Sequence, residues 1–284
     1  MEIINRRQRM ASIARKLRRE AKTVGFVATM GALHEGHLAL VKECRQMCDV
    51  VVVSIFVNPT QFNQKTDLDK YPRDLTSDAA TLAEYDVDYI FAPDAEEIYP
   101  ESFSTYVNVD GLTETLEGAS RPGHFRGVAT VVTILFNTIR PDFAFFGQKD
   151  AQQVAVVKRL TRDLGFETEI VVIPVVREES GLALSSRNSL LSDEEHQEAS
   201  IIIEALREAK IAFKKGERNA VNLNEIVKKR IETRPLAEVD YIAIIDRETL
   251  QPLDKVGDEE ALIAAAVAFG GVRLIDNVIL NRKQ

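Results

Sequence analysis

Long apolar runs are scarce in this 284-residue sequence, and their scarcity excludes several classes of protein. No uncharged apolar run reaches the roughly 18 residues needed to span a bilayer. The N-terminus lacks the apolar segment of a secretory signal. We therefore expect a cytoplasmic protein with no membrane partner. Internal repeats and low-complexity tracts are also lacking, which argues against repeat arrays and disordered chains.

Cysteine is scarce too, with Cys44 and Cys48 as its only copies. Their spacing of four residues would place both thiols on one face of a helix. Two thiols do not complete a zinc site, and no histidine or further cysteine follows at ligand spacing. We therefore interpret both cysteines as small buried apolar side chains.

Positive charge is in deficit, because the chain carries a net charge of −8. This acidic balance argues against a nucleic-acid partner. Residues 1–22 are an exception, with eight Lys and Arg against two Glu. A transit peptide or an RNA-binding arm would also be basic. However, Met10, Ile13, Ala14 and Leu17 recur at helical spacing between the arginines, and this pattern favours an amphipathic surface helix.

Strand and helix patterns alternate through the first part of the chain. Apolar runs typical of buried parallel strands lie at 24–28, 50–57, 87–92, 142–146 and 170–174, with helical patterns at 75–85, 128–139 and 151–164 and an irregular stretch at 93–126. This alternation predicts an α/β fold with a Rossmann-like, doubly wound parallel sheet over residues 1–175. In such sheets, ligands bind beyond the carboxyl ends of the strands.

The remaining residues, 176–284, have a different pattern. A small polar loop is followed by helical patterns at about 193–213 and 222–231 and by apolar runs at 239–245, 261–268 and 272–274. We expect a second, smaller α+β domain here, acting as a lid. A length of 284 residues is consistent with one large and one smaller domain.

A candidate anion site directly follows the first of these apolar runs. Residues 29–37 read Thr-Met-Gly-Ala-Leu-His-Glu-Gly-His, and a helical pattern begins with them. Backbone N–H groups at a helix N-terminus lack intrahelical partners and carry partial positive charge, so they attract phosphate. His34 and His37 would share one helical face, and Gly36 leaves room for a nucleotide. An isolated His-x-Gly-His could equally be a surface turn, but the strand-turn-helix context favours phosphate binding.

Two later loops add positive charge. Gly147-Gln148-Lys149-Asp150 follows the run at 142–146, and Ser185-Ser186-Arg187 lies in the expected second domain. Lys149 is well placed for a phosphate, although a lone Gly-x-Lys-Asp is more often a solvated loop. Arg187 could bind two phosphate oxygens at once.

Taken in order, these three features resemble the nucleotidyltransferases and class I aminoacyl-tRNA synthetases that carry the H-I-G-H and K-M-S-K-S signatures. Within that class, the chain resembles the pantoate–β-alanine ligase (pantothenate synthetase) family over nearly its whole length. Five segments carry the resemblance: Thr29–His37, Ser54–Phe62, Glu117–Phe125, Phe146–Gln153 and Leu184–Asn188. Thr60 and Gln148 depart from a frequent methionine and a frequent glutamate of that family, which leaves the details of substrate packing open.

The resemblance implies a set of site residues. Pantoate would contact Gln61 and Gln153, and β-alanine would also contact Gln61. His37 would be the catalytic histidine, with His34, Lys149 and Arg187 supplying further donors to the phosphates. Asp78 could approach a Mg²⁺ ion that accompanies ATP. ATP itself would contact Met30, Gly31, His34, Gly36, His37, Gly147, Gln148, Lys149, Asp150, Val176, Leu184, Ser185, Ser186 and Arg187.

The resemblance also implies a reaction and an assembly. The expected enzyme is an ATP-dependent ligase that condenses (R)-pantoate with β-alanine through a pantoyl-adenylate, releases AMP and pyrophosphate, and forms a homodimer. The main alternative is a simple nucleotidyltransferase that acts on a phosphorylated small molecule. It would share the two histidines but would not need two glutamines for a carboxylic acid. A nucleotide-binding regulator without chemistry is the other alternative.

Overall fold

The computed structural model describes residues 1–63 and 65–281. Its internal contacts divide the chain into two compact units. Unit 1 consists of residues 1–147 and 152–173, and unit 2 consists of residues 148–151 together with the chain from Pro174 onward. The short segment 148–151 thus groups with the C-terminal part of the sequence, although unit 1 flanks it on both sides.

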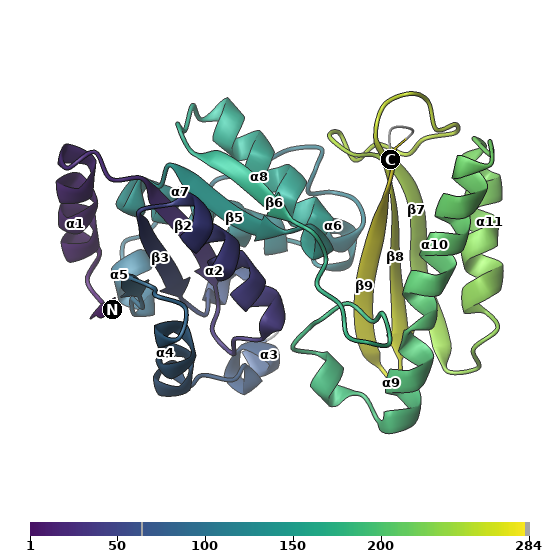
Figure 1. The fold of residues 1–284 in the computed structure, drawn as a ribbon, viewed down its shortest axis with the longest axis horizontal. Coiled ribbons are helices and arrows are strands. Elements are labelled where there is room, and N and C mark those ends of the chain that lie inside the picture. The colour runs from purple at the N-terminus through teal and green to yellow at the C-terminus, as the bar shows by residue number, and fades with distance from the viewer. Residues whose placement is uncertain (64, 282–284) are drawn as a thin grey trace. The chain divides into compact units, whose positions relative to one another are not determined.

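Unit 1 is built on a parallel sheet whose six strands have the order β1-β4-β3-β2-β5-β6 (Figure 1). Every neighbouring pair in this sheet is parallel. The strands are β1 (Glu2–Ile4), β2 (Val24–Thr29), β3 (Val50–Ile55), β4 (Tyr89–Phe91), β5 (Phe143–Gly147) and β6 (Glu169–Ile173).

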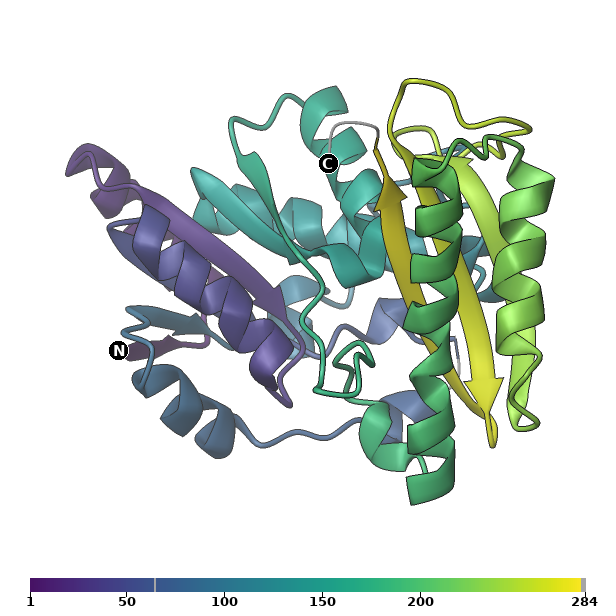
Figure 2. The same cartoon turned by 45° about the vertical axis from the view of Figure 1, so that its right-hand side comes forward.

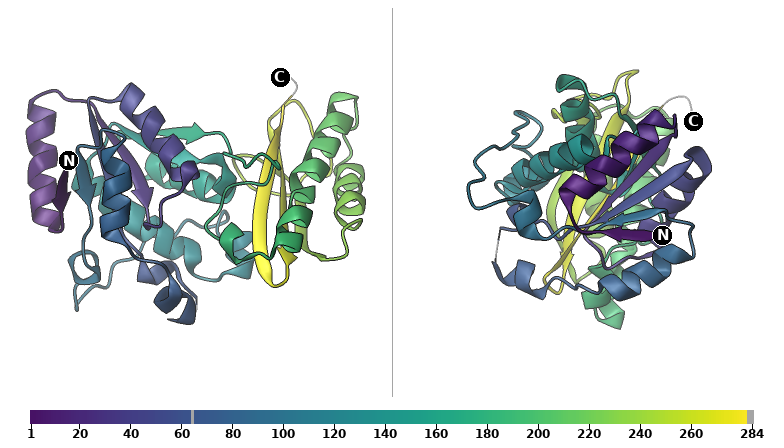
Figure 3. Two further views of the ribbon diagram at one scale, coloured as in Figure 1. Left: turned by 60° about the horizontal axis from the view of Figure 1, so that its bottom comes forward. Right: turned by 90° about the vertical axis from the view of Figure 1, so that its left-hand side faces the viewer.

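Helices cover both faces of this sheet. On one face, Leu38, Val41 and Cys44 pack in a single core cluster with the strand residues Val27 and Val53. On the other face, the ring of Phe136 meets the ring of Phe26 edge-on, with centroids 6.2 Å apart. Figure 3 shows the N-terminal helix, in purple, beside the sheet. The helices are α1 (Arg7–Arg19), α2 (Glu35–Met47), α3 (Lys65–Lys70), α4 (Leu75–Ala83), α5 (Ala95–Ile98), α6 (Glu117–Ser120), α7 (His124–Ile139) and α8 (Ala151–Asp163).

The predicted doubly wound α/β fold is therefore confirmed. The strand order reverses direction between β2 and β5, because β3 and β4 lie on one side of this pair and β6 lies on the other. In open parallel sheets, ligands bind at the carboxyl ends of the strands that flank such a reversal. The loops that follow β2 and β5 are those that the sequence indicated for phosphate binding.

Unit 2 contains a separate antiparallel sheet, formed by β7 (Ala237–Asp246), β8 (Ala261–Phe269) and β9 (Val272–Leu280) in that order. Figure 2 shows two long helices, in green, packed along one face of this sheet. These are α10 (Ile201–Lys214) and α11 (Ala220–Ile231). Their apolar residues, among them Leu206, Phe213 and Leu223, form one buried cluster with strand residues such as Ile263 and Leu274.

Some boundaries differ from the sequence prediction. β1 was not predicted, because three residues are too few to show a periodic pattern. Helix α7 begins at His124 instead of residue 128, and the stretch 93–126 contains the short helices α5 and α6. The helix predicted at 193–213 is interrupted at Ser200, which divides it into α9 (Asp193–Ala199) and α10. β9 also extends six residues beyond its predicted end, to Leu280.

The interpretation of the cysteines is confirmed. Cys44 and Cys48 are both free and both buried in the core beneath α2. The hydrogen bond with Cys48, together with burial, raises the pKa of the Cys44 thiol far above its usual range. The raised pKa keeps the thiol protonated. Because only the thiolate is reactive, this thiol behaves as a small apolar side chain.

Within the described part of the chain, no helix is long and apolar enough to cross a membrane.

Candidate active site

The loop after β2 is held in one conformation by buried polar groups. The Thr29 hydroxyl donates to the Ser54 carbonyl over 2.7 Å, and the Gly31 N–H donates to the Thr29 Oγ1 over 3.2 Å. Gly31 has φ of +82°, and a Cβ placed there would lie 2.8 Å from Oδ2 of Asp78. Glycine is therefore required at this turn both by its backbone conformation and by the close approach of a carboxylate.

That carboxylate belongs to Asp78 on α4, which is only 5% exposed. Its Oδ2 accepts the Ala32 N–H at 3.1 Å, and its Oδ1 accepts the Leu33 N–H at 2.9 Å. Hydrogen bonds from backbone N–H groups stabilise a buried carboxylate. Asp78 thus fixes the two residues immediately before His34.

His34 and His37 are oriented by the start of α2. His34 is the N-cap residue, and its Nδ1 accepts the Gly36 N–H at 3.1 Å. The Nδ1 of His37 accepts the His34 N–H at 3.3 Å. The two rings lie against each other, with centroids 4.0 Å apart. A nitrogen that accepts a hydrogen bond carries no proton, so the neutral form of either ring has its hydrogen on Nε2.

The Gln61 side chain lies beside this loop. Gln61 is the last residue of a short 3-10 turn, η1 (Pro59–Gln61), that begins after Asn58. The Asn58 Nδ2 donates to the Gln61 Oε1 over 3.1 Å, and the Gln61 Nε2 lies 2.7 Å from the Met30 sulfur. The structure thus brings two of the expected site residues, Met30 and Gln61, into contact.

The main chain of Gln61 is held by residues whose roles the sequence did not reveal. His124 Nδ1 donates to the Gln61 carbonyl over 2.9 Å, and Arg121 Nη1 lies 3.3 Å from His124 Nε2. The helix α7 approaches closely at Gly127, where a Cβ would lie 2.5 Å from the Thr60 carbonyl oxygen. Two signals in the sequence pointed to this region: the length of the irregular stretch 93–126, and the segment Glu117–Phe125 that carries part of the family resemblance.

Two neighbouring glutamines at the start of α8 have different environments. Gln152 is 6% exposed, and its Nε2 donates to the carbonyls of Leu112 and Thr115, each over 2.8 Å. Its Oε1 accepts the Glu117 N–H at 3.0 Å. Gln152 therefore anchors the stretch before α6. The expected pantoate residue, Gln153, is half-buried one position further along the helix.

The cationic segment after β5 groups with unit 2. Gln148, Lys149 and Asp150 form the 3-10 turn η2 (Gln148–Asp150), which follows Gly147 at the end of β5. Lys149 Nζ lies 3.4 Å from Asp150 Oδ1, and the lysine side chain is 22% exposed. Its charge is therefore partly shielded from solvent while remaining accessible.

The second cationic segment belongs to the same unit. Leu184 donates its N–H to the Val176 carbonyl over 3.0 Å, which closes a hairpin-like loop before the Ser-Ser-Arg sequence. Ser185 Oγ accepts the Arg187 N–H at 3.3 Å, and Ser186 and Arg187 are exposed. Arg187 also donates to the Arg273 carbonyl over 3.2 Å. The expected ATP residues from 176 to 187 thus lie along one segment, which contains this loop and a turn at Ser186 and Arg187.

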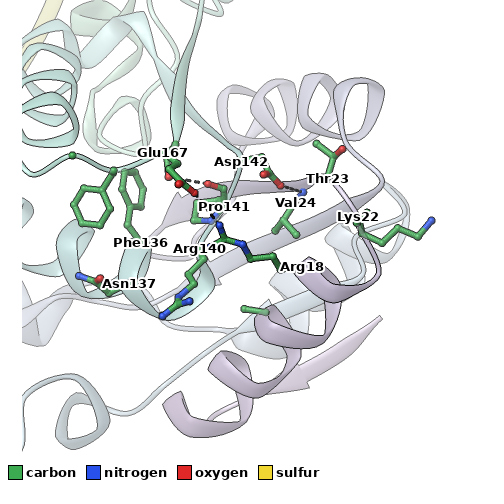
Figure 4. A pocket seen from close by; sticks show the side chains of 15 residues that line it. Arg18, Lys22, Thr23, Val24, Phe136, Asn137, Arg140, Pro141, Asp142 and Glu167 are labelled. Atoms are coloured by element: carbon green, nitrogen blue, oxygen red, sulfur yellow. Dashed lines mark hydrogen bonds and ion pairs between the residues drawn. The ribbon is translucent and has the colours of Figure 1, made fainter.

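A cavity of about 370 Å³ lies elsewhere in unit 1, at the edge of the sheet where the strands begin (Figure 4). Its lining includes the cations Arg18, Lys22 and Arg140, but Arg18 pairs with Glu167 at 3.2 Å. Helices α1 and α7 end there, and cations stabilise the partial negative charge of helix C-termini. The helix ends and the ion pair with Glu167 therefore explain why cations gather at this cavity. None of the expected site residues lines it.

Comparisons with known proteins identify the family of this chain. Residues 2–279 match the family model of the pantoate-beta-alanine ligases. The chain is 51% identical over 283 residues to a pantothenate synthetase of Thermosipho africanus, covering 99% of this chain and 100% of that relative. A pantothenate synthetase of Pelotomaculum thermopropionicum is 49% identical over 282 residues, covering 99% of this chain and 100% of its own.

Solved structures give the same result. A crystal structure of pantothenate synthetase from Thermus thermophilus has a TM-score of 0.91 and 44% identity, covering 99% of this chain and 100% of its own. The Francisella tularensis pantoate-beta-alanine ligase, complexed with beta-gamma ATP and beta-alanine, has a TM-score of 0.80 and 38% identity, covering 98% of this chain and 97% of its own. The chain therefore belongs to the pantoate–β-alanine ligase family and is an enzyme of that family.

Proposed function

We propose that this enzyme joins (R)-pantoate to β-alanine in two steps and that the residues described above hold the substrates. In the first step, a pantoate carboxylate oxygen attacks the α-phosphorus of ATP, and the bond to the β-phosphate oxygen breaks to release pyrophosphate. In the second step, the β-alanine amine attacks the acyl carbon of the pantoyl-adenylate, AMP leaves, and the amine loses a proton. The observation that carries this proposal is the pair of imidazoles fixed through Nδ1 at the start of α2.

The first step brings an anion to a polyanion, so it depends on fixed donors placed where charge develops. We propose that His34 and His37 donate from Nε2, together with the N-terminal N–H groups of α2 and the cations of Lys149 and Arg187. Gly147, Gln148, Asp150, Val176, Leu184 and Ser185 would contact the rest of ATP. The amides of Gln61 and Gln153 would orient pantoate without neutralising its nucleophilic charge.

Mg²⁺ would accompany ATP and neutralise phosphate charge. The described residues contain no group of three or more His, Cys, Asp or Glu side chains suited to a metal ion. This absence is compatible with Mg²⁺ sites, because Mg²⁺ commonly relies on substrate phosphates, waters and one or two carboxylates. The predicted role of Asp78 as a ligand remains a proposal, and its two backbone hydrogen bonds favour a role in positioning the loop.

Asp78→Asn tests these two roles of Asp78. An amide offers one oxygen where the carboxylate offers two, so one loop N–H loses its acceptor, at a cost of about 1–3 kcal/mol of stability. For a positioning role, we expect slower pantoyl-adenylate formation with no change in the Mg²⁺ concentration that gives the half-maximal rate. Magnesium titrations of ATP–pyrophosphate exchange measure this. A large increase in the required Mg²⁺ would instead identify Asp78 as a ligand.

The order of the two steps gives a direct test of the proposed reaction. Because adenylation precedes attack by the amine, pantoate alone should support exchange of labelled pyrophosphate into ATP, without β-alanine. A panel of other small carboxylic acids serves as the control. An exchange reaction that requires β-alanine would contradict the two-step mechanism. Exchange supported only by a phosphorylated small molecule would instead favour a simple nucleotidyltransferase.

Two further expectations extend this proposal. We expect a homodimer, as the family resemblance implies, and a cytoplasmic location, as the sequence predicts. Sedimentation of the purified protein measures the first property, and cell fractionation measures the second.

A further inference from the structure

The two cationic loops of unit 2 are both attached to adjacent residues of one strand. Asp276 and Asn277 lie near the middle of β9, opposite Ala265 and Ala264 of β8. Successive side chains of a strand point to opposite faces, so these two side chains point in opposite directions. Each is only 4% exposed. Buried polar groups are normally hydrogen-bonded, and the partners of this pair show what each of them holds in place.

Asn277 is bonded to the turn that carries Lys149. Its Nδ2 donates to the carbonyls of Gln148 and Lys149, each over 3.0 Å. Its Oδ1 accepts from Nε2 of Gln148 at 2.9 Å. The Asn277 amide thus binds the backbone carbonyls of two consecutive residues of η2, Gln148 and Lys149. It also binds the side-chain amide of Gln148.

Asp276 is bonded to the loop that leads to Arg187. It accepts two hydrogen bonds from the Arg177 guanidinium, at 2.6 and 3.0 Å. Arg177 also donates to the Gly181 carbonyl over 3.1 Å and pairs with Ala183 across the same loop. Two parallel hydrogen bonds between a guanidinium and a carboxylate fix the orientation of the two groups as well as the distance between them.

We infer that Asn277 is a positioning residue of the ligase, which holds the backbone of Lys149 in a fixed relation to the Arg187 loop. The inference rests on the proposed role of Lys149 at the phosphates. It also explains why residues 148–151 group with unit 2, even though η2 directly follows a strand of the parallel sheet. The segments that carry Lys149 and Arg187 are then both fixed to β9, the first through Asn277 and the second through Asp276.

Asn277→Ala tests this inference. Removing three hydrogen bonds lets η2 shift, and a shift of about 1 Å in a positioned group can cost on the order of 100-fold in rate. We expect kcat/KM for ATP in pyrophosphate exchange to fall about 10- to 100-fold, with an unchanged KM for β-alanine. Asn277→Asp has the same shape but places a carboxylate against two carbonyl oxygens, so it should be at least as impaired.

Asn224→Ala is the matched control. Asn224 also belongs to unit 2 and donates to a strand carbonyl, that of Ile242, over 2.9 Å. Its removal deletes one hydrogen bond of a half-buried side chain, so it should lower the melting temperature slightly while leaving kcat/KM for ATP unchanged. Should Asn277→Ala fail to fold, Asn277→Ser retains one hydroxyl donor, and its kcat/KM should lie between those of Asn277→Ala and the wild type.

A double variant separates positioning from general destabilisation. If Asn277 acts through Lys149, adding Asn277→Ala to Lys149→Ala should lower the rate by less than about threefold, because the side chain that it positions is already gone. Fully multiplicative losses, or a normal kcat/KM for ATP in Asn277→Ala, would overturn the inference. A normal rate in Lys149→Ala would contradict the proposed role of Lys149 itself.

Discussion

Lys149→Ala and His37→Ala should each lower the turnover of pantothenate formation by about 10²–10³, the range observed when one preorganised donor to developing charge is removed. In the chain, His37 follows the end of β2 and Lys149 follows the end of β5, the two strands that flank the reversal of strand order. Rapid-quench measurement of the pantoyl-adenylate would show whether the loss falls on the first step.

Lys158→Ala is the matched control for Lys149→Ala. Lys158 is an exposed residue of α8, and its removal changes the net charge of the chain by the same amount. We expect its turnover to stay within about twofold of the wild type, because exposed charges are largely screened by solvent. Near-normal turnover in Lys149→Ala or His37→Ala would exclude that side chain from the chemistry.

Arg187→Ala should abolish most adenylate formation while changing stability by less than about 0.5 kcal/mol, as expected for an exposed surface position. Arg187 is exposed, and its side chain donates a hydrogen bond to the Arg273 carbonyl. A guanidinium can bind two phosphate oxygens at once. Its loss would therefore remove both a positive charge and a pair of oriented hydrogen-bond donors. ATP–pyrophosphate exchange and thermal unfolding measure the two effects.

Arg230→Ala provides the comparison in the same unit. Arg230 makes ion pairs with Glu204 and Glu208 at the surface, and such pairs contribute little to stability. It should retain normal exchange. We also expect ATP to protect residues 177–189 from limited proteolysis in the wild type. Equal cleavage with and without ATP, together with normal exchange in Arg187→Ala, would exclude this loop from the phosphate site.

The sequence alone determined the parallel sheet and the position of the candidate site. Apolar runs such as 50–57 are long enough to predict buried strands, and the loop containing His34 and His37 follows such a run. The short strand β1 was not predicted, because three residues are too few to show a periodic pattern. The break at Ser200 was not predicted either, because the helical pattern continues through it. Local patterns therefore identify long elements and the motifs at their ends.

Only the tertiary structure decided which side chains hold those motifs in place. Asp78 lies far along the chain from the loop that it fixes, and His124 lies even farther from the Gln61 carbonyl that it contacts. Asn277 is separated by more than a hundred residues from the turn of Lys149. Such hydrogen bonds leave no periodic signal in the sequence. The sequence around a polar residue does not show which distant group will be its hydrogen-bond partner, because folding alone brings the two together. The candidate phosphate motifs are thus local, while the geometry that orients them depends on contacts between distant segments.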